Sequence, residues 1–297
     1  MNRVAFGATG LEVSPLGIGT TRNREVLTCL LDAGANVVDT AQCYEGHEEF
    51  LGATVAHRRE EFVLVSKCGH HNVLPDGSLR SRAISMDDID GALRRLRTDR
   101  LDVMLLHSYD RDLLERGDAV GVLLEARRAG KIRFAGYSGD NESAQLAAVT
   151  TGLDVIETSI SFLDQHGIDA VLPPCALAGA GTIAKRPIAN AAWRWLGAAE
   201  AGVPDGVLPY VQRLAALEID PALVGEIEGG WSELALRFNL AVPGLCTSIV
   251  GTGSVANARA NVEFVSRGPL PNAVYDALRE QFRFARDRSN AAWPGLN

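Results

Sequence analysis

The sequence predicts an α/β protein, a closed (β/α)8 (TIM) barrel over residues 1–297 as a single domain, with an N-terminal β-hairpin and a C-terminal helix and tail. Three observations predict this fold. Short apolar runs rich in β-branched residues alternate with longer amphipathic stretches about eight times after Leu16. No change of composition and no Ser- or Pro-rich linker divides the chain. Eight such units typically need about 250 residues, which fits the length of 297.

Local signals predict each element in turn. A hairpin is predicted over 4–13, with its turn at Ala8-Thr9-Gly10. Short apolar runs are typical of buried parallel strands, and they predict strands at 16–19, 37–39, 62–67, 103–106, 132–136, 155–159, 182–185 and 247–250. Apolar residues at helical spacing predict helices at 25–33, 48–56, 86–96, 119–129, 143–150, 170–177, 232–240, 256–262 and 272–285. Gly34 is a suitable C-cap for the first helix, and Ser85 is an N-cap for the third.

Two long irregular stretches, 70–84 and 188–205, interrupt the alternation, and long loops in a compact domain are usually functional or disordered. A doubly wound open sheet is the alternative fold. It is disfavoured because Gly17-Ile18-Gly19-Thr20, after the first barrel strand, lacks the third glycine of a dinucleotide-binding turn.

The composition excludes several classes of function. A net charge of −8 and a pI near 5.3 argue against nucleic-acid binding. The N-terminus has no apolar signal core, and no apolar stretch is long enough to span a membrane, so we expect a cytoplasmic protein without a membrane partner. The five cysteines are scattered, which excludes a zinc ribbon or a complete disulfide framework. We also expect no metal site, because His70-His71 has no further ligands that the sequence indicates.

Four polar residues follow successive predicted strands: Asp39, Tyr44, Lys67 and His107. The carboxyl ends of barrel strands meet at one rim, where barrel enzymes place their sites. An ammonium beside a phenol favours the phenolate and lowers the phenol pKa, and a carboxylate holds the ammonium in place. An imidazole orients a carbonyl oxygen. Taken singly, each residue has a structural alternative: a turn cap, a solvated strand end, a buried core histidine or a surface tyrosine.

These four residues together are suited to deliver a proton to a carbonyl oxygen while a hydride attacks the carbonyl carbon. Since no side chain donates a hydride, a nicotinamide cofactor is expected.

The motifs resemble those of the aldo-keto reductase superfamily. The segment from Asp39-Thr-Ala-Gln-Cys-Tyr44 to Gly52 is similar to its first signature, and Val65-Ser66-Lys67 and Leu105-Leu106-His107 match its next two blocks. The similarity extends from Leu11 to Asn261. It implies a (β/α)8 barrel that reduces carbonyl compounds with NAD(P)H. It also implies that Tyr44 is the general acid, that Lys67 tunes it, that Asp39 anchors Lys67, and that His107 orients the carbonyl.

The cofactor blocks depart from this pattern. Where the family has Ser-Asn and Gln around the nicotinamide amide, this chain has Ser138, Gly139 and Glu157. An ionised Glu accepts hydrogen bonds but cannot donate them. Lys185 stands where the family has an aromatic residue that stacks on the nicotinamide. Either Lys185 or Arg186 could pair with the pyrophosphate of the cofactor. The alternative is that both side chains are solvated at the end of a strand.

The last block resembles the loop that binds the adenosine phosphate, with backbone amides and a helix N-terminus for the anion. The resemblance implies cofactor contacts at Gly251, Thr252, Gly253, Asn257 and Asn261. The cations that many members use for the 2′-phosphate are absent at Gly251 and Asn257, so NADP(H) and NAD(H) both stay open.

Three aromatic residues, Tyr109, Trp193 and Trp195, are candidate walls of the substrate pocket, with core packing as the alternative for each. Two other functions are consistent with the same sequence. One is an NAD(P)-binding regulatory or sensor protein with little turnover, which the departures at the cofactor site favour. The other is a lyase or isomerase that uses Lys67 as a Schiff base, which Asp39 and Tyr44 disfavour because they suit a charged lysine.

Overall fold

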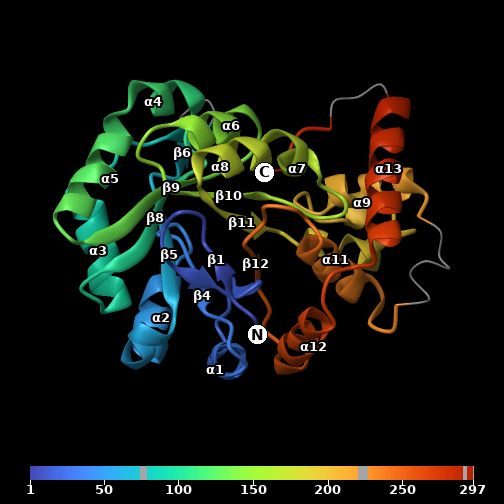
Figure 1. Cartoon of the computed structure of the whole chain (residues 1–297), viewed down its shortest axis with the longest axis horizontal. Helices are drawn as coiled ribbons and strands as arrows, with labels where there is room; N and C mark the ends of the chain where they lie inside the picture. Colours follow the sequence, from blue (N-terminus) through green and yellow to red (C-terminus); the bar gives the residue numbers. More distant parts are fainter. Residues whose placement is uncertain (74–78, 220–226, 290–292, 297) are drawn as a thin grey trace.

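The computed structural model describes residues 1–73, 79–219, 227–289 and 293–296 of the chain. Eight parallel strands close into a barrel, in the order β10-β11-β12-β3-β4-β5-β8-β9 (Figure 1). Their bounds are β3 (Leu16–Ile18), β4 (Val37–Asp39), β5 (Val63–Cys68), β8 (Leu101–His107), β9 (Ile132–Ser138), β10 (Val155–Ser159), β11 (Gly181–Lys185) and β12 (Thr247–Val250). The predicted barrel is confirmed, and the doubly wound alternative is wrong because β12 pairs with β3 and closes the sheet.

The predicted hairpin is present as β1 (Val4–Ala5) and β2 (Glu12–Val13), which pair antiparallel. It closes the end of the barrel where the strands begin. Phe6 and Val13 are fully buried in the same apolar cluster as the residues inside the barrel. The ring of Phe6 lies where a side chain on Gly181 would be, within 2.7 Å of an added Cβ, so only glycine fits there. The opposite rim, where the strands end, is therefore the end that the hairpin leaves uncovered.

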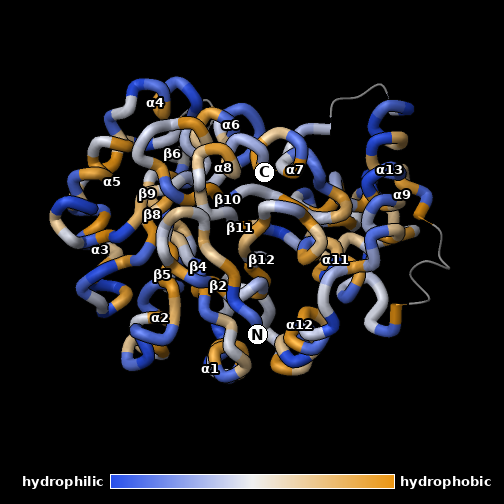
Figure 2. The backbone as a smooth tube through the Cα atoms, viewed as in Figure 1, coloured by the Kyte–Doolittle hydropathy of each residue, from blue (hydrophilic) through white to orange (hydrophobic). Residues whose placement is uncertain are grey.

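Helices surround the barrel and cover the outward faces of its strands (Figure 1). Apolar residues that point outward from the strands pack against the inward faces of these helices in one large cluster, and polar residues lie outside (Figure 2). The covering helices are α1 (Arg24–Asp32), α2 (His47–Val55), α3 (Met86–Leu96), α5 (Asp118–Arg128), α6 (Asn141–Val149), α8 (Leu172–Ala178), α11 (Gly230–Leu240) and α12 (Val255–Ser266).

Further helices extend one side of the barrel. A second apolar cluster, with Phe162, Tyr210, Phe238 and Phe282, joins α9 (Leu208–Leu217), α11 and α13 (Asn272–Arg288). The remaining short helices are α4 (Arg111–Arg116), α7 (His166–Ala170), η1 (Ala56–Glu61), η2 (Ala189–Trp195) and η3 (Glu200–Gly202). In the part of the chain that the structure describes, no helix is both long enough and apolar enough to traverse a lipid bilayer.

Several elements differ from the prediction. The irregular stretch 70–84 contains an antiparallel pair, β6 (His71–Val73) and β7 (Leu79–Ser81). The helix predicted at 170–177 is two helices, because Pro173 and Pro174 begin α8, where a missing N–H breaks no hydrogen bond. Helix α9, which also carries a proline in its first turn, was not predicted.

Candidate active site

The residues at the open rim follow a simple rule of strand geometry. Side chains two residues apart on a strand point to the same face. The barrel interior contains Val37, Val65, Leu105, Val155 and Ile183, with Ile249 of β12 beside them. Two residues further on, at the carboxyl end of the same six strands, stand Asp39, Lys67, His107, Glu157, Lys185 and Gly251. Five of these six rim residues are polar, whereas the residue two positions before each of them is apolar.

Lys67 lies between two carboxylates in this layer. Its ammonium donates to Asp39 Oδ1 and, at 3.1 Å, to the carbonyl of Thr40, and it lies 3.3 Å from Glu157 Oε1. All three side chains are buried. Ser138 stands behind Glu157 and donates to the same Oε1 at 3.0 Å, so it positions the carboxylate. Sequence reasoning assigned Glu157 to the cofactor and missed its contact with Lys67.

The charges in this group act on one another. Burial opposes the charge of Lys67, but the carboxylates of Asp39 and Glu157 outweigh it and raise the pKa of the lysine. Burial, together with the negative charge of Glu157, raises the pKa of Asp39 well above its usual value, against the opposing effect of Lys67. Lys67 is therefore a permanent cation.

Tyr44 lies in the loop between β4 and α2, with the Lys67 ammonium 5.7 Å from the centre of its ring. Lys67 has the largest effect on the phenol and lowers its pKa, as the sequence predicts. Burial and the carboxylates of Asp39 and Glu157 act in the opposite direction and prevail, so the pKa of Tyr44 is raised to about 12. The expected lowering is wrong as a net effect, because burial of the phenol and the carboxylates of Asp39 and Glu157 together outweigh Lys67.

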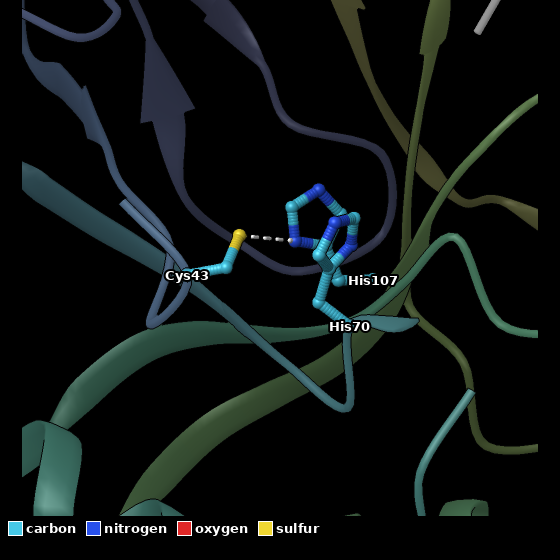
Figure 3. A group of neighbouring side chains, drawn as sticks. All are labelled: Cys43, His70 and His107. Atoms are coloured by element: carbon cyan, nitrogen blue, oxygen red, sulfur yellow. Dashed lines mark hydrogen bonds between the residues drawn. The ribbon is translucent and has the colours of Figure 1, made fainter. Parts of the chain in front are cut away.

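His107 ends β8 and faces the Tyr44 ring edge-on, with the ring centres 6.0 Å apart. The sulfur of Cys43 lies 3.4 Å from His107 Nδ1, and the ring of His70 lies against that of His107 at 4.5 Å between centres (Figure 3). If the Cys43 thiol donates to Nδ1, the imidazole proton stays on Nε2, from which it can be donated to a carbonyl oxygen.

The loop that carries Tyr44 is held by a buried histidine that sequence reasoning missed. His47 is fully buried, with Nδ1 2.7 Å from Thr40 Oγ1 and Nε2 3.0 Å from the carbonyl of Thr21. Burial lowers the pKa of His47, which favours the neutral ring that such a bridge needs. His47 thus ties the end of β4 to the end of β3.

A cavity of about 790 Å³ opens above these groups. It is lined by Gly19, Thr20, Asp39, Cys43, Tyr44, His70, His107, Ser108, Glu157, Lys185, Arg186, Pro187, Ile188, Asn190, Ala191, Ile249, Val250 and Gly251. Three of the four predicted catalytic residues are on its wall, and Lys67 lies directly behind Asp39. Glu157 Oε2 is buried at this wall and has no hydrogen-bond partner in the described part of the chain.

The predicted adenosine-phosphate loop adjoins the cavity through Gly251. An added Cβ on Gly251 would lie 2.7 Å from the carbonyl oxygen of Thr20, so the backbone after β12 packs tightly against that after β3. Thr252 Oγ1 accepts from Ser254, and Ser254 caps α12 by accepting from the amide of Asn257. The Asn257 side chain is exposed, whereas Asn261 is buried in α12.

Both cations proposed for the pyrophosphate already have protein partners. Lys185 lies 2.8 Å from Asp140 Oδ2, and Arg186 donates to the carbonyl of Leu296 at 2.5 Å. The last described residues, 293–296, run across the rim beside these cations. Their backbone is bound by side chains from other segments, Asn141, Asp164, Arg186 and Arg213. The sequence predicts a C-terminal tail but not the side chains that bind its backbone.

The three aromatic residues proposed as substrate walls are not among the described residues that line the cavity. Tyr109 is buried and donates to the carbonyl of Arg82. Trp193 packs against Phe162 and Trp231, at 6.4 and 6.2 Å between ring centres, and these two rings are 5.8 Å apart, in the second apolar cluster. Trp195 ends η2 and is half-buried. The alternative of structural packing fits Tyr109 and Trp193.

Comparison with known proteins places this geometry in context. The model of the aldo/keto reductase family matches residues 3–281. The chain is 24% identical to the uncharacterised oxidoreductase YqkF of Bacillus subtilis over 94% of this chain and 96% of that protein. It is also 24% identical to L-galactose dehydrogenase of Arabidopsis thaliana, over 98% of this chain and 96% of that protein. The holo form of aldo-keto reductase AKR11C1 from Bacillus halodurans has the same fold, with a TM-score of 0.77 and 23% identity. The match covers 95% of this chain and 96% of that chain.

Proposed function

Because the chain belongs to the aldo/keto reductase family, we propose that it reduces an aldehyde or ketone to the alcohol with NADPH or NADH. The carbonyl carbon gains a hydride and the oxygen gains a proton. Tyr44 is the proton donor in this proposal. The observation that carries it is the grouping of Tyr44 and His107 on one cavity wall, with the Lys67 cation 5.7 Å from the phenol ring.

The residues have distinct roles in proton delivery. His107 donates a hydrogen bond to the carbonyl oxygen and holds it near Tyr44, which lies against its ring. Tyr44 then gives its proton to the oxygen as negative charge develops there. Lys67 stabilises the phenolate left behind. Asp39 keeps Lys67 charged and fixes its position through their hydrogen bond.

The cavity also fits a nicotinamide cofactor, which when bound supplies the hydride. Glu157 Oε2 is a buried acceptor that lacks a partner among the described residues, and it suits the N–H of a carboxamide. The amides at Gly251–Gly253 and the N-terminus of α12 suit the phosphate end. We therefore place the cofactor between Glu157 and α12. All five cysteines are free thiols, which supports a cytoplasmic location.

The first test is cofactor binding followed by turnover. Titration of the protein with NADPH and NADH should quench or shift the reduced-nicotinamide fluorescence. Reduction is then screened over aldehydes, α-dicarbonyls, sugars and ketosteroids. Tyr44→Phe should lower turnover by about 10²- to 10⁴-fold, the usual contribution of general acid catalysis, with cofactor affinity kept.

Tyr275→Phe is a matched control, because Tyr275 packs on Phe238 far from the cavity, and it should leave turnover unchanged. Absence of cofactor binding would overturn the proposal. Binding with no turnover on any carbonyl would instead favour the regulatory or sensor protein.

A further inference from the structure

We propose that Cys43, His70 and His107 form a site for a zinc-class metal ion, and that metal bound there inhibits the reductase. The three side chains meet at the cavity wall although they come from different segments (Figure 3). Cys43 belongs to the loop between β4 and α2, His70 follows β5, and His107 ends β8. The sulfur and the ring nitrogens that would ligate all lie within 4.8 Å of one another.

The spacing is close to what a tetrahedral ion needs. With bonds of about 2.3 Å to sulfur and 2.0–2.1 Å to nitrogen, a zinc ion holds its sulfur and nitrogen ligands about 3.6 Å apart. Cys43 Sγ and His107 Nδ1 are already 3.4 Å apart. His70 has only to turn its ring toward the same point, and its ring is in contact with that of His107. No movement of the barrel is required.

The donor set selects the class of ion. One thiolate and two imidazoles suit Zn²⁺ and its analogue Co²⁺, whereas Mg²⁺ and Ca²⁺ prefer oxygen ligands. When the ion binds, Cys43 gives its thiol proton to solvent and the sulfur forms the bond to the metal. Three protein ligands leave a fourth position, which faces the cavity and would take water.

Inhibition follows from the identity of one ligand, and this part of the inference rests on the proposed function. His107 is the residue assigned to the carbonyl oxygen through Nε2, whereas the metal would bind Nδ1, the nitrogen beside Cys43. Tyr44 adjoins Cys43 in sequence and faces His107, so the ion and the water on its fourth position would fill the part of the cavity beside Tyr44 where the carbonyl must bind. Zinc should therefore compete with the carbonyl substrate.

Metal binding is measured directly, without reference to activity. The untagged full chain, treated with a chelator and then freed of it, is titrated with Co²⁺. We expect one ion per chain and a thiolate-to-cobalt charge-transfer band. Zn²⁺ should displace the cobalt, and Mg²⁺ should not. Cys43→Ser should abolish the band, and His70→Asn should weaken binding by at least about 100-fold, since loss of even an outer-shell partner costs 10- to 100-fold.

Matched controls remove the same chemical groups elsewhere. Cys29→Ser, in α1, and His57→Asn, exposed in η1, should bind cobalt as the unsubstituted chain does. Circular dichroism checks that each variant is folded. No charge-transfer band in the unsubstituted chain would overturn the site, as would a band that survives Cys43→Ser.

Activity is measured in a separate arm. Zinc should raise the apparent KM for the carbonyl, with an inhibition constant equal to its dissociation constant, and the Cys43→Ser variant, compared with its own metal-free rate, should lose this sensitivity. A chain that binds cobalt but reduces no carbonyl contradicts the proposed function and leaves the metal site standing. A chain that reduces carbonyls faster with zinc overturns the inhibition.

Discussion

Glu157 Oε1 lies 3.3 Å from Lys67 Nζ, although the two residues are 90 positions apart in the sequence and stand on strands β10 and β5, which do not pair. Lys67 thus has a carboxylate on two sides, Asp39 and Glu157, in place of the single one that the sequence pattern suggests. Burial, Asp39 and this second carboxylate together raise the pKa of Tyr44.

The high pKa of Tyr44, about 12, predicts opposite pH dependence for the two directions of the reaction. Reduction needs the protonated phenol, which persists below the raised pKa, so its rate should stay nearly constant from about pH 6 to 9 as far as Tyr44 is concerned. Alcohol oxidation needs the phenolate and should rise about tenfold per pH unit over the same window. Steady-state rates in both directions check this, and an oxidation rate that is level across the window would contradict it.

Replacing the second carboxylate should shift that profile. Glu157→Gln removes a negative charge that raises the pKa of Tyr44, so the rise of alcohol oxidation should move to lower pH. Glu233→Gln changes an equally buried glutamate that pairs with Arg237 and Arg267 in the outer helices, and it should not move the profile. An unmoved profile in Glu157→Gln would remove Glu157 from the tuning of Tyr44.

A tight helix contact predicts the effect of one methyl group on stability. An added Cβ on Gly52 of α2 would collide with the carbonyl oxygen of Arg95 and lie 2.8 Å from the carbonyl carbon of Leu96, in α3. Gly52→Ala should therefore lower the free energy of unfolding by about 1–3 kcal/mol. Gly121→Ala, in α5 with no atom near the added Cβ, should raise it by about 0.5–1 kcal/mol. Denaturant unfolding measures both, and equal effects would contradict the predicted contact.

Buried Asp164 should make stability depend on pH. Burial raises the pKa of Asp164 to about 7, against the opposing charge of Arg213, while an unfolded Asp titrates near 3.9. The folded state then binds its proton more tightly than the unfolded state. The free energy of unfolding should therefore fall as pH rises from about 4 to about 7, by an amount of the order of 4 kcal/mol from this residue.

Asp164→Asn should reduce that fall, as followed by urea unfolding at several pH values. Asp276→Asn, an exposed carboxylate on α13, should leave it unchanged. If the free energy of unfolding falls with pH as steeply in Asp164→Asn as in the unsubstituted chain, another group is responsible.

Much of the fold could be predicted because it depends on local signals. The strands predicted at 155–159 and 247–250 coincide with β10 and β12, and Ser85 caps α3 as its neighbours suggest. The alternation on each strand could also have indicated Glu157 and Lys185 as rim residues, since both follow an interior residue by two positions. What local signals could not indicate is which rim residues meet.

Contacts across the barrel depend on its closure and on loop paths. The pairing of Lys185 with Asp140 and the approach of Cys43 to His107 join segments 45 and 64 residues apart. Trp193 was proposed for the pocket from its loop alone, and its stack with Phe162 and Trp231 needs three remote segments. Each of these is a tertiary contact without a periodic pattern in the sequence.

The docked tail has a practical consequence for work with this protein. The hairpin that follows the N-terminus closes one end of the barrel, whereas residues 293–296 cross the opposite rim, where the cavity opens. A purification tag or fusion partner added to the C-terminal end would therefore extend the chain beside the cavity. There it could displace Leu296 from its hydrogen bonds with Asp164 and Arg186. The same tag placed before Met1 would leave from the far end. Assays of substrate range and of metal binding are best made with N-terminal tags that can be cleaved.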